Sequence, residues 1–478
     1  VMAQEPTKKI KEVADAPWHR LEIIDLSDDQ KWAFYKSATE ERDTLVVQST
    51  AGKRRYAFAD AKKGGFFGSD YFVFHDGKAV QVLHLKTGRR QQFDAAVDFV
   101  LAGQLLGVIE HNGAVAKLSV FTRDMVAVGT MDNVEVFKEH ADASSIAAVG
   151  RDNGKAVLTI HQWERGTVRR YGSSLVASTA SNLVWSEEGK KIAFVGGEAA
   201  TAHLCTYALE DQKVQVLEEE LLALSLELAP NKELYFSNDG KRLFFKARSA
   251  NRLPKNPSDA VQVWNAADKW IYTAEQQIMG FTRSPLLMAW EPESNRLLQI
   301  TDTVLPYAAV LNDHYALLWN PKGYEPQASI FPPVDLYLAD LSTGARKLVL
   351  ERQLGTETNW YASPDGHRFA YFKELHWWVY DAVDDSHENV SKGFGASFGG
   401  EKQDWTELSK AYGCAGWTPD GTSLLLYDAF DLWQVGVDRR KAIRLTKGRE
   451  SSMMYRVVRA EGNRHLSAAF LFFLTQKI

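Results

Sequence analysis

The sequence predicts an all-β fold, a β-propeller of seven or eight four-stranded blades. The first observation behind this prediction is a turn pattern that recurs along the chain. It consists of Ser or Thr, an acidic residue two positions later, Gly or a polar residue, and then a short apolar run. Such turns join antiparallel strands, because Gly and Asp accept the backbone conformations that close a hairpin. Copies begin at Ser27, Ser186, Ser237, Ser363 and Thr418.

The second observation is the spacing of these copies. Ser186 and Ser237 are 51 residues apart, and Ser363 and Thr418 are 55 apart. A unit of this length lies at the long end of known blade periods. The step of 159 residues from Ser27 to Ser186 then predicts three units. The step of 126 residues from Ser237 predicts two units and an insertion around 252–257.

The third observation is a second hairpin in several units, at 80–93, 336–350 and 432–446. Two linked hairpins in each period are typical of a four-stranded blade. The best example is 411–448, where Trp417 precedes the first turn, 424–427 is apolar and 428–431 is a second turn. A unit this small cannot bury its own faces, so we expect it to stack on its neighbours.

Along the chain, we expect a flexible N-terminal arm over 1–17 and the propeller over 18–448. Residues 449–478 are expected to supply the last strands, either the start of an unfinished blade or the closure of the ring. The region 94–172 has the least regular pattern, although it still predicts strands. At 217–229, leucines at helical spacing predict a short helix or a long acidic turn.

The composition narrows the class of protein. The chain has 478 residues and a net charge of −5, which gives no reason to expect nucleic-acid binding. No run approaches about 18 apolar residues, so no membrane span is predicted. Cys205 and Cys414 are too far apart in the repeat to predict a disulfide or a Cys metal site. The small residue Ala3 resembles the end of a cleaved export signal and predicts a periplasmic protein; the alternative is a disordered polar tail.

Ser397 is the one candidate nucleophile. It lies in Gly395-Ala396-Ser397-Phe398-Gly399-Gly400, which matches the G-x-S-x-G-G elbow of serine hydrolases. That elbow requires a strand before the Ser, a helix after it, and an Asp and a His downstream. The flanking residues predict neither element, and the only later His is His465. The segment is therefore interpreted as a flexible, Gly-rich loop between blades, with Ser397 exposed and distant from any His.

No metal or cofactor site is predicted. No two His are four residues apart, as a helical metal pair requires, and the closest pairs, 75/84 and 367/376, are nine apart. Asp428 and Asp431 flank Phe430 and are expected to cap turns. No phosphate loop or dinucleotide fingerprint is present.

The run from Gly416 to Gly448 resembles the non-catalytic N-terminal propeller of large bacterial peptidases of the prolyl oligopeptidase family, which is similar to the dipeptidyl peptidase IV propeller. The resemblance is best over 180–448. It includes the order of four earlier pieces, 334–338, 343–344, 363–366 and 378–381.

The resemblance implies a function as part of a larger enzyme. In that family the propeller screens an α/β-hydrolase domain and admits only peptides and short chains. We therefore expect this chain to admit peptide substrates to a hydrolase domain of the same gene product that 1–478 does not contain. Ser397 does not correspond to the family nucleophile. Residues 217–220 do not match the Glu-Glu element that binds a substrate amine, so aminodipeptidase specificity is not expected.

Two alternatives of other classes remain open. The chain could be a stand-alone exported propeller that binds a protein or a carbohydrate. It could also be a complete serine hydrolase that uses Ser397. The full gene and an active-site probe would separate these functions.

Overall fold

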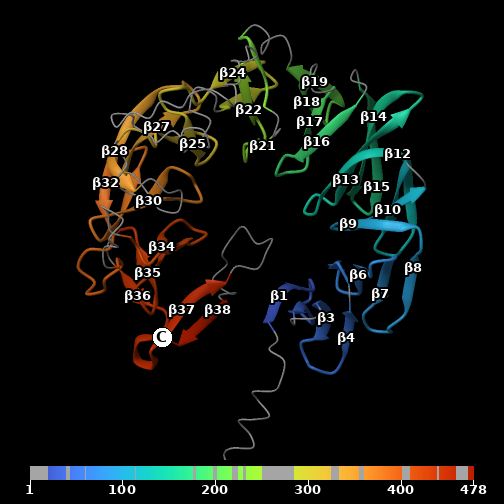
Figure 1. Ribbon diagram of the computed structural model, residues 1–478, viewed down its shortest axis with the longest axis horizontal. Coiled ribbons are helices and arrows are strands. Elements are labelled where there is room, and N and C mark those ends of the chain that lie inside the picture. The colour runs from blue at the N-terminus through green and yellow to red at the C-terminus, as the bar shows by residue number, and fades with distance from the viewer. Residues whose placement is uncertain are drawn as a thin grey trace, which may run out of the picture. The chain divides into compact units, whose positions relative to one another are not determined.

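The computed structural model describes most of the chain as β-strands (Figure 1). The described residues are 20–38, 43–59, 61–112, 115–175, 179–197, 202–217, 224–229, 233–249, 285–324, 333–354, 360–400, 410–438, 441–458 and 472–477. They divide into two compact units. Unit 1 comprises 1–192 and 207–214, and unit 2 comprises 193–206 and 215–478.

Unit 1 begins with two four-stranded sheets. The first contains β1 (Arg20–Leu26), β2 (Trp32–Ala38), β3 (Asp43–Ser49) and β4 (Arg55–Ala59), and the second contains β5 (Lys63–Phe67), β6 (Tyr71–His75), β7 (Val80–His84) and β8 (Arg90–Phe93). A seven-stranded sheet follows, with β9 (Ala96–Ala102), β10 (Leu105–Asn112), β11 (Val115–Thr122), β12 (Ala127–His140), β13 (Ser145–Asp152), β14 (Lys155–Glu164) and β15 (Thr167–Ser174). The boundary between the units falls within the next sheet, which consists of β16 (Ala180–Trp185), β17 (Lys191–Gly196), β18 (His203–Ala208) and β19 (Lys213–Leu217).

Unit 2 continues with sheets of the same kind. A five-stranded sheet contains β20 (Leu226–Leu228), β21 (Leu234–Phe236), β22 (Leu243–Ser249), β23 (Leu286–Glu291) and β24 (Arg296–Gln299), with both β20 and β21 paired to β22. Three four-stranded sheets follow, formed by β25 (Tyr307–Val310), β26 (Tyr315–Trp319), β27 (Pro333–Asp340) and β28 (Arg346–Leu354); by β29 (Trp360–Ala362), β30 (Arg368–Lys373), β31 (His376–Asp381) and β32 (Ser386–Asn389); and by β33 (Cys414–Trp417), β34 (Ser423–Tyr427), β35 (Leu432–Gly436) and β36 (Ala442–Arg444). The 3-10 helix η3 (Arg449–Ser451) precedes a two-stranded sheet of β37 (Met453–Val458) and β38 (Phe472–Lys477).

Nearly all of these sheets are antiparallel meanders whose strands follow chain order, which is how the blades of a β-propeller are built. The predicted fold class, an all-β β-propeller, is confirmed. Among the described residues, eight sheets have four or more strands. The described part of the chain contains no α-helix and, accordingly, no helix long and apolar enough to cross a membrane.

The region 94–172, which looked least regular in sequence, forms the largest sheet. Its long strand β12 pairs with β11 through its first half and with β13 through its second half, with Val134 in both ladders. The seven strands are therefore two four-stranded blades that share one strand. Three sheets, of four, four and seven strands, precede the sheet that contains Ser186. Because the seven-stranded sheet holds two blades, the step from Ser27 to Ser186 covers four blades rather than the three units predicted. The strands of this region are joined by short turns. Each blade there is therefore shorter than the 51 residues from which the period was predicted.

The recurring turns have one geometry. In all five, the hydroxyl of the first residue accepts a hydrogen bond from the N–H of the residue five positions later. The carbonyl of the first residue accepts the N–H of the residue three positions later, which closes a tight turn. Asp239, Asp365 and Asp420 all accept a hydrogen bond from the first residue of their turn, so the prediction that they are equivalent is confirmed. Each turn joins the strand that it follows to the next strand of the same sheet.

The core consists of apolar layers between consecutive sheets. In unit 1, Phe58 of β4 stacks on Phe74 of β6 with ring centroids 4.0 Å apart. In unit 2, Trp319 of β26 meets Trp360 of β29 at 5.2 Å. Full burial of such a side chain contributes about 1.5–3 kcal/mol, so these layers hold the series of sheets together.

Other expectations from the sequence have mixed outcomes. In 217–229, the described part is strand and turn rather than helix, because Leu226–Leu228 pairs with β22. Cys205 and Cys414 are both buried, and neither forms a disulfide among the described residues. The C-terminal segment was expected to start an unfinished blade or to close the ring, and its strand β38 pairs with β37 in a two-stranded antiparallel sheet. The arm 1–17, the insertion 252–257 and His465 lie outside the described residues.

Trp417 provides a test of the packing between blades. Its side chain is 7% exposed, and its indole N–H donates to the carbonyl of Tyr361 in the preceding sheet at 2.8 Å. Trp417→Ala should lower the free energy of unfolding by about 3–5 kcal/mol, because it leaves a cavity and removes the hydrogen bond to Tyr361. Chemical denaturation measures this loss. Val383→Ala is the control, because Val383 is 68% exposed, and an equal loss in both variants would contradict the assignment. Trp433 of the same sheet is only half-buried, so its truncation should cost less.

His161 makes the stability depend on pH. It is 3% exposed, and burial, followed by the charge of Arg170, lowers its pKa from 6.5 to about 4. The unfolded chain therefore binds a proton at a higher pH than the folded chain does. The contribution is complete above pH 6.5 and is lost as the pH falls toward 4, a change of about 3 kcal/mol. Denaturation at several pH values measures this effect: between pH 6.5 and 4 the free energy of unfolding should fall less steeply with pH in His161→Asn than in wild type. An equally steep fall in both proteins would show that His161 is accessible to solvent.

Candidate functional site

The loop that contains Ser397 connects β32 to β33. Ser397 is exposed, and its hydroxyl donates to the carbonyl of Gly399 at 3.1 Å. Among the described residues, neither a strand directly before it nor a helix after it forms the elbow that activates a serine nucleophile. Among the described residues its hydroxyl forms no hydrogen bond with a His ring, so the geometry of an activated hydroxyl is not assembled there.

The same loop is anchored to the core by its next residue. Phe398 is 1% exposed and packs in the cluster between the last two four-stranded sheets. Gly399 forms a β-bridge with Ala411, and a Cβ on Gly399 would lie 2.8 Å from Phe372. The sequence suggested that these glycines provide flexibility. At Gly399 the structure shows a different role, because the backbone approaches a buried ring too closely for a side chain.

The histidines singled out in the sequence are separate from one another. His75 and His84 each accept a hydrogen bond from a nearby turn N–H. His376 lies 3.4 Å from the hydroxyl of Ser391, but that hydroxyl is buried and already accepts the N–H of Trp377. No group of three or more His, Cys, Asp or Glu that could hold a metal ion occurs in the described part of the chain.

The most elaborate polar arrangement lies in the turn between β34 and β35. Asp428 and Asp431 are 1% and 0% exposed. Oδ1 of Asp428 accepts the N–H groups of Phe430 and Asp431 at 2.7 and 2.6 Å. Oδ2 accepts the indole N–H of Trp433 at 3.0 Å. The sequence predicted turn caps here, and Asp428 is one, but burial of both carboxylates was not anticipated.

Cations and donors from the following segment complete this site. Oδ2 of Asp428 accepts from Arg449 at 3.2 Å, and Oδ2 of Asp431 pairs with Arg444 at 2.7 Å. Oδ1 of Asp431 accepts the hydroxyl of Thr446 at 2.8 Å and the N–H of Gly448. A charge buried this deeply requires paired cations and hydrogen bonds, which these groups supply.

The surroundings also set the charge of Asp428. Burial alone would raise its pKa, but the N–H groups of Asp431 and Phe430, the indole of Trp433 and the guanidinium of Arg449 outweigh it and lower the pKa. Asp428 is thus ionised at neutral pH. The stability that it contributes is present above the ordinary carboxyl pKa and is lost as the pH falls through its lowered value.

This turn, which we call the aspartate turn (428–431), also binds β37. The N–H of Tyr455 donates to the carbonyl of Phe430 at 2.8 Å, and Arg456 donates to the carbonyl of Asp428 at 3.2 Å. A Cβ on Gly448 would lie 2.1 Å from the carbonyl oxygen of Met453, so only glycine fits. Every oxygen of the two carboxylates already accepts hydrogen bonds. The arrangement therefore suits a structural connection between the last four-stranded sheet and β37 rather than binding of a metal or substrate.

A second repeated hydrogen bond was missed in the sequence. In three sheets, a Ser or Thr hydroxyl that follows the fourth strand accepts the N–H at the start of the third strand, 14 residues earlier. The pairs are Leu287 with Thr301, Trp377 with Ser391, and Leu432 with Thr446. The signal was available as Ile-Thr, Val-Ser and Leu-Thr at 300–301, 390–391 and 445–446.

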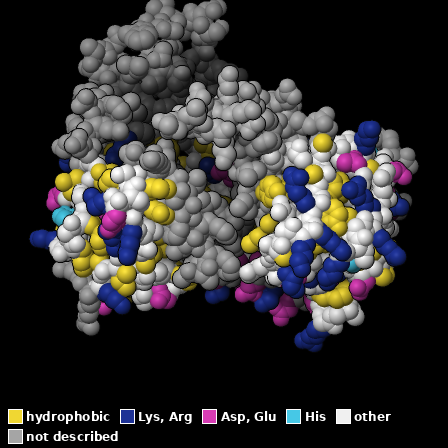
Figure 2. Space-filling view, turned by 90° about the horizontal axis from the view of Figure 1, so that it is seen from below, with side chains coloured by type: hydrophobic (Ala, Val, Ile, Leu, Met, Phe, Trp, Pro, Cys, Tyr) yellow, Lys and Arg dark blue, Asp and Glu magenta, His cyan; other side chains and the backbone are white. Residues whose placement is uncertain are grey.

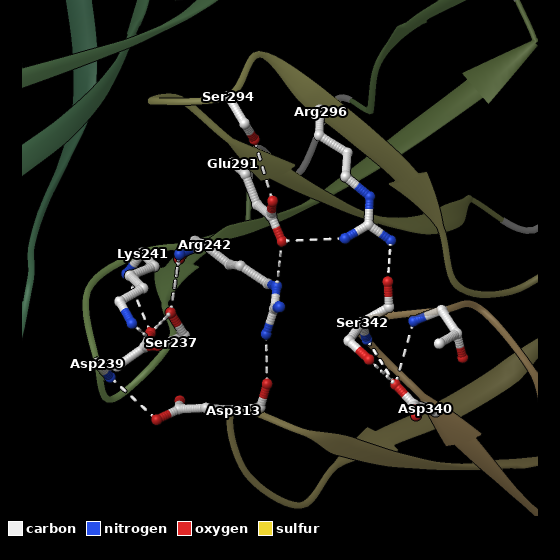
Figure 3. Close-up of polar contacts among 11 residues, drawn as sticks. Ser237, Asp239, Lys241, Arg242, Glu291, Ser294, Arg296, Asp313, Asp340 and Ser342 are labelled. Atoms are coloured by element: carbon white, nitrogen blue, oxygen red, sulfur yellow. Dashed lines mark hydrogen bonds and ion pairs between the residues drawn. The ribbon is translucent and has the colours of Figure 1, made fainter.

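Neighbouring turns in unit 2 are also joined to each other (Figure 3). The carboxylate of Asp313, in the β25–β26 turn, accepts the N–H groups of Asn238 and Asp239 at 2.7 and 3.1 Å. Arg242 donates to the carbonyl of Asp313 and pairs with Glu291 at 2.7 Å. These contacts connect the five-stranded sheet to the next one.

An Arg at the equivalent position of its turn also connects two sheets further along the chain. Arg368 stands five residues after Ser363, as Arg242 does after Ser237, and it donates to the carbonyl of Gly421 at 3.2 Å. In both cases an Arg fixes the first turn of the following sheet. An Arg fork suits this role, because it can reach a carbonyl and a carboxylate at once.

Comparisons with solved structures show similarity at low sequence identity to several proteins. The chain is similar to Porphyromonas gingivalis dipeptidyl peptidase 4, with a TM-score of 0.39 and 11% identity, over 92% of this chain and 55% of that one. It is similar to the β-propeller domain of the Trilobed protease from Pyrococcus furiosus, with a TM-score of 0.29 and 12% identity, over 70% and 99%. A eukaryotic initiation factor gives 0.39 and 9%, over 78% and 88%.

At these TM-scores the similarities do not identify a family, and the fold assignment rests on the strand order of the sheets. No family model matches the chain, and no curated protein matches its sequence.

Removal of the Asp431 carboxylate tests the aspartate turn. Asp431→Ala should cost about 3–5 kcal/mol in the free energy of unfolding, because it removes the buried acceptor of the Thr446 hydroxyl and the Gly448 N–H and one of the two carboxylates that pair with Arg444. Hydrogen exchange of the Tyr455 amide should also become faster, since that amide is held by the same turn. Asp384→Ala, which removes an exposed carboxylate, is the control. Unchanged exchange at Tyr455 in Asp431→Ala would show that the aspartate turn does not hold β37.

Proposed function

We propose that this chain is the non-catalytic β-propeller of a serine peptidase of the prolyl oligopeptidase family. In this proposal it admits peptide substrates to an α/β-hydrolase domain of the same gene product. The observation that carries the proposal concerns the residues on which the sequence resemblance rests. Trp417, Asp428, Asp431 and Thr446 all belong to one blade, and the last three are connected by hydrogen bonds through the aspartate turn.

The hydrogen bonds among these residues explain why the Asp, Trp and Thr residues of this blade occur together. Asp428 needs the indole of Trp433, and Asp431 needs the hydroxyl of Thr446 and the backbone at Gly448. A single Asp-Gly turn is common to all propellers and supports no particular family. A complete set of mutually dependent residues, in the order that the family resemblance requires, is more specific support.

The position of Ser397 agrees with a propeller that lacks chemistry of its own. Its hydroxyl donates to Gly399 in an exposed loop, and the adjacent Phe398 anchors that loop in the core. The activated nucleophile that acyl transfer requires must be bonded to a base and face an oxyanion hole. In the proposal, that chemistry belongs to the hydrolase domain.

A fluorophosphonate probe applied to the protein expressed from the entire gene tests this proposal. We expect the label on a serine outside 1–478, and no label on the isolated chain. Ser397→Ala in the entire protein should leave labelling and peptide hydrolysis unchanged, since Ser397 is not the nucleophile.

The outcomes separate the alternatives. Label on Ser397, lost in Ser397→Ala, would show a complete hydrolase and overturn the proposal. An entire gene product that neither reacts with the probe nor hydrolyses peptides would instead favour a propeller that binds a protein or carbohydrate. The admitting role has its own test, which compares a short peptide with the same sequence inside a folded protein. Equal cleavage of both would contradict it.

A further inference from the structure

The first two sheets of unit 1 carry a charge opposite to that of the whole chain. Residues 43–93 contain nine Lys and Arg against four Asp and no Glu, a net charge of +5, whereas the whole chain has −5. In Figure 2, dark blue Lys and Arg side chains gather closely on one part of the visible surface. The charge is thus concentrated on one part of unit 1.

Two turns bring most of these cations together. Lys53 and Arg54 lie in the β3–β4 turn and Arg55 begins β4, whereas Lys86 and Arg89 lie in the β7–β8 turn and Arg90 begins β8. All six residues are exposed, and we call them the basic surface. The guanidinium of Arg54 donates to the carbonyl of Lys86 in the other turn.

A further contact fixes the spacing of the two turns. The hydroxyl of Tyr56, next to the first turn, donates to the carbonyl of Leu85 at 3.0 Å. The two turns therefore form one continuous surface within unit 1, although they are about thirty residues apart in the sequence.

Five of the six cations of the basic surface lack a carboxylate partner among the described residues. Lys86 pairs with Asp70 at 2.7 Å, and the structure gives none of the other five an ion pair among the described residues. Arg90 instead lies over the rings of Phe58 and Phe74. Elsewhere, exposed cations such as Arg151, Lys190 and Lys347 are paired. Like charges held this close repel one another, so an anionic partner would relieve a cost that the fold itself does not remove.

We propose that the basic surface binds an acidic polypeptide segment in extended conformation. Exposed Arg forks bind carboxylates well, because two parallel N–H groups match the two oxygens. The strands beside the turns favour a polypeptide. β4 and β8 are the last strands of their sheets and pair only with β3 and β7 among the described strands. Their outer edges offer backbone N–H and C=O groups with which an extended chain can pair.

Two other anionic partners fit less well. Single-stranded nucleic acid needs aromatic rings on which bases can stack, but Phe58 and Phe74 are buried, at 6% and 1% exposed, beneath Arg90. A membrane surface needs apolar side chains among the cations. The large exposed apolar side chains of the described chain all lie outside 43–93.

Binding of a fluorescein-labelled oligoglutamate peptide of about ten residues, long enough to run along one strand, tests the proposal. Fluorescence anisotropy at low ionic strength gives the Kd. The triple variant Lys53→Gln/Arg55→Gln/Arg89→Gln should raise Kd about tenfold, since each exposed pair contributes modestly. Arg54 and Arg90 are left unchanged because they contact the fold.

The matched control is Lys155→Gln/Arg165→Gln/Lys213→Gln, which removes the same charge from other exposed positions of unit 1. It should leave Kd nearly unchanged. An equal rise in Kd in both triple variants would overturn the proposal, because binding would then depend on net charge alone. No binding of the peptide by wild type would also overturn it. Thermal melting of both variants should match wild type, which confirms that they are folded.

Two further probes test the choice of partner. An oligoglutamate with alternate N-methylated amides keeps its charge but cannot pair fully with an edge strand, so it should bind more weakly. Equal binding of this peptide would show that no extended backbone is recognised and would overturn the proposal. Tighter binding of single-stranded DNA or of phosphatidylserine vesicles, lost in Lys53→Gln/Arg55→Gln/Arg89→Gln, would overturn it in favour of those partners.

Discussion

The burial of one sheet's apolar face against the next sheet is the interaction on which this structure depends. A four-stranded sheet of five-residue strands is too small to be stable alone, so its faces must be covered by neighbours. The paired rings Phe58–Phe74 and Trp319–Trp360 are such contacts. Between the last two four-stranded sheets, the hydrogen bond from Trp417 to the carbonyl of Tyr361 also fixes how the sheets are aligned. Polar connections between sheets come second, because they align layers that apolar burial already holds.

Those polar connections gather at the turns, where each sheet would otherwise expose backbone groups. A buried Ser or Thr hydroxyl satisfies the turn from within, and an Arg from the previous sheet secures it from outside, as Arg242 and Arg368 do. The aspartate turn extends the same principle to β37. Two carboxylates are stable there because several N–H groups, a hydroxyl and two guanidinium groups surround them.

The residues that carry the resemblance to a peptidase propeller therefore have a structural role. They maintain one blade and its connection to the following strand, so their loss would disturb stability before it disturbed any chemistry. The basic surface is different. Lys53, Arg55 and Arg89 contribute little to the fold, so they can be altered without disturbing the sheets. The two regions can thus be studied independently of each other.

The sequence by itself determined the fold class and the equivalence of the turns, because Asp239, Asp365 and Asp420 act through hydrogen bonds within a few residues. Features that need distant partners were decided by tertiary structure alone. Strand β12 serves two blades because both halves find partners, although its sequence looked irregular. Asp431 is buried because Arg444, Thr446 and Gly448 return to it, and Gly399 is required by the ring of Phe372. The basic surface arises because two turns about thirty residues apart meet, a distance over which local sequence pattern carries no information.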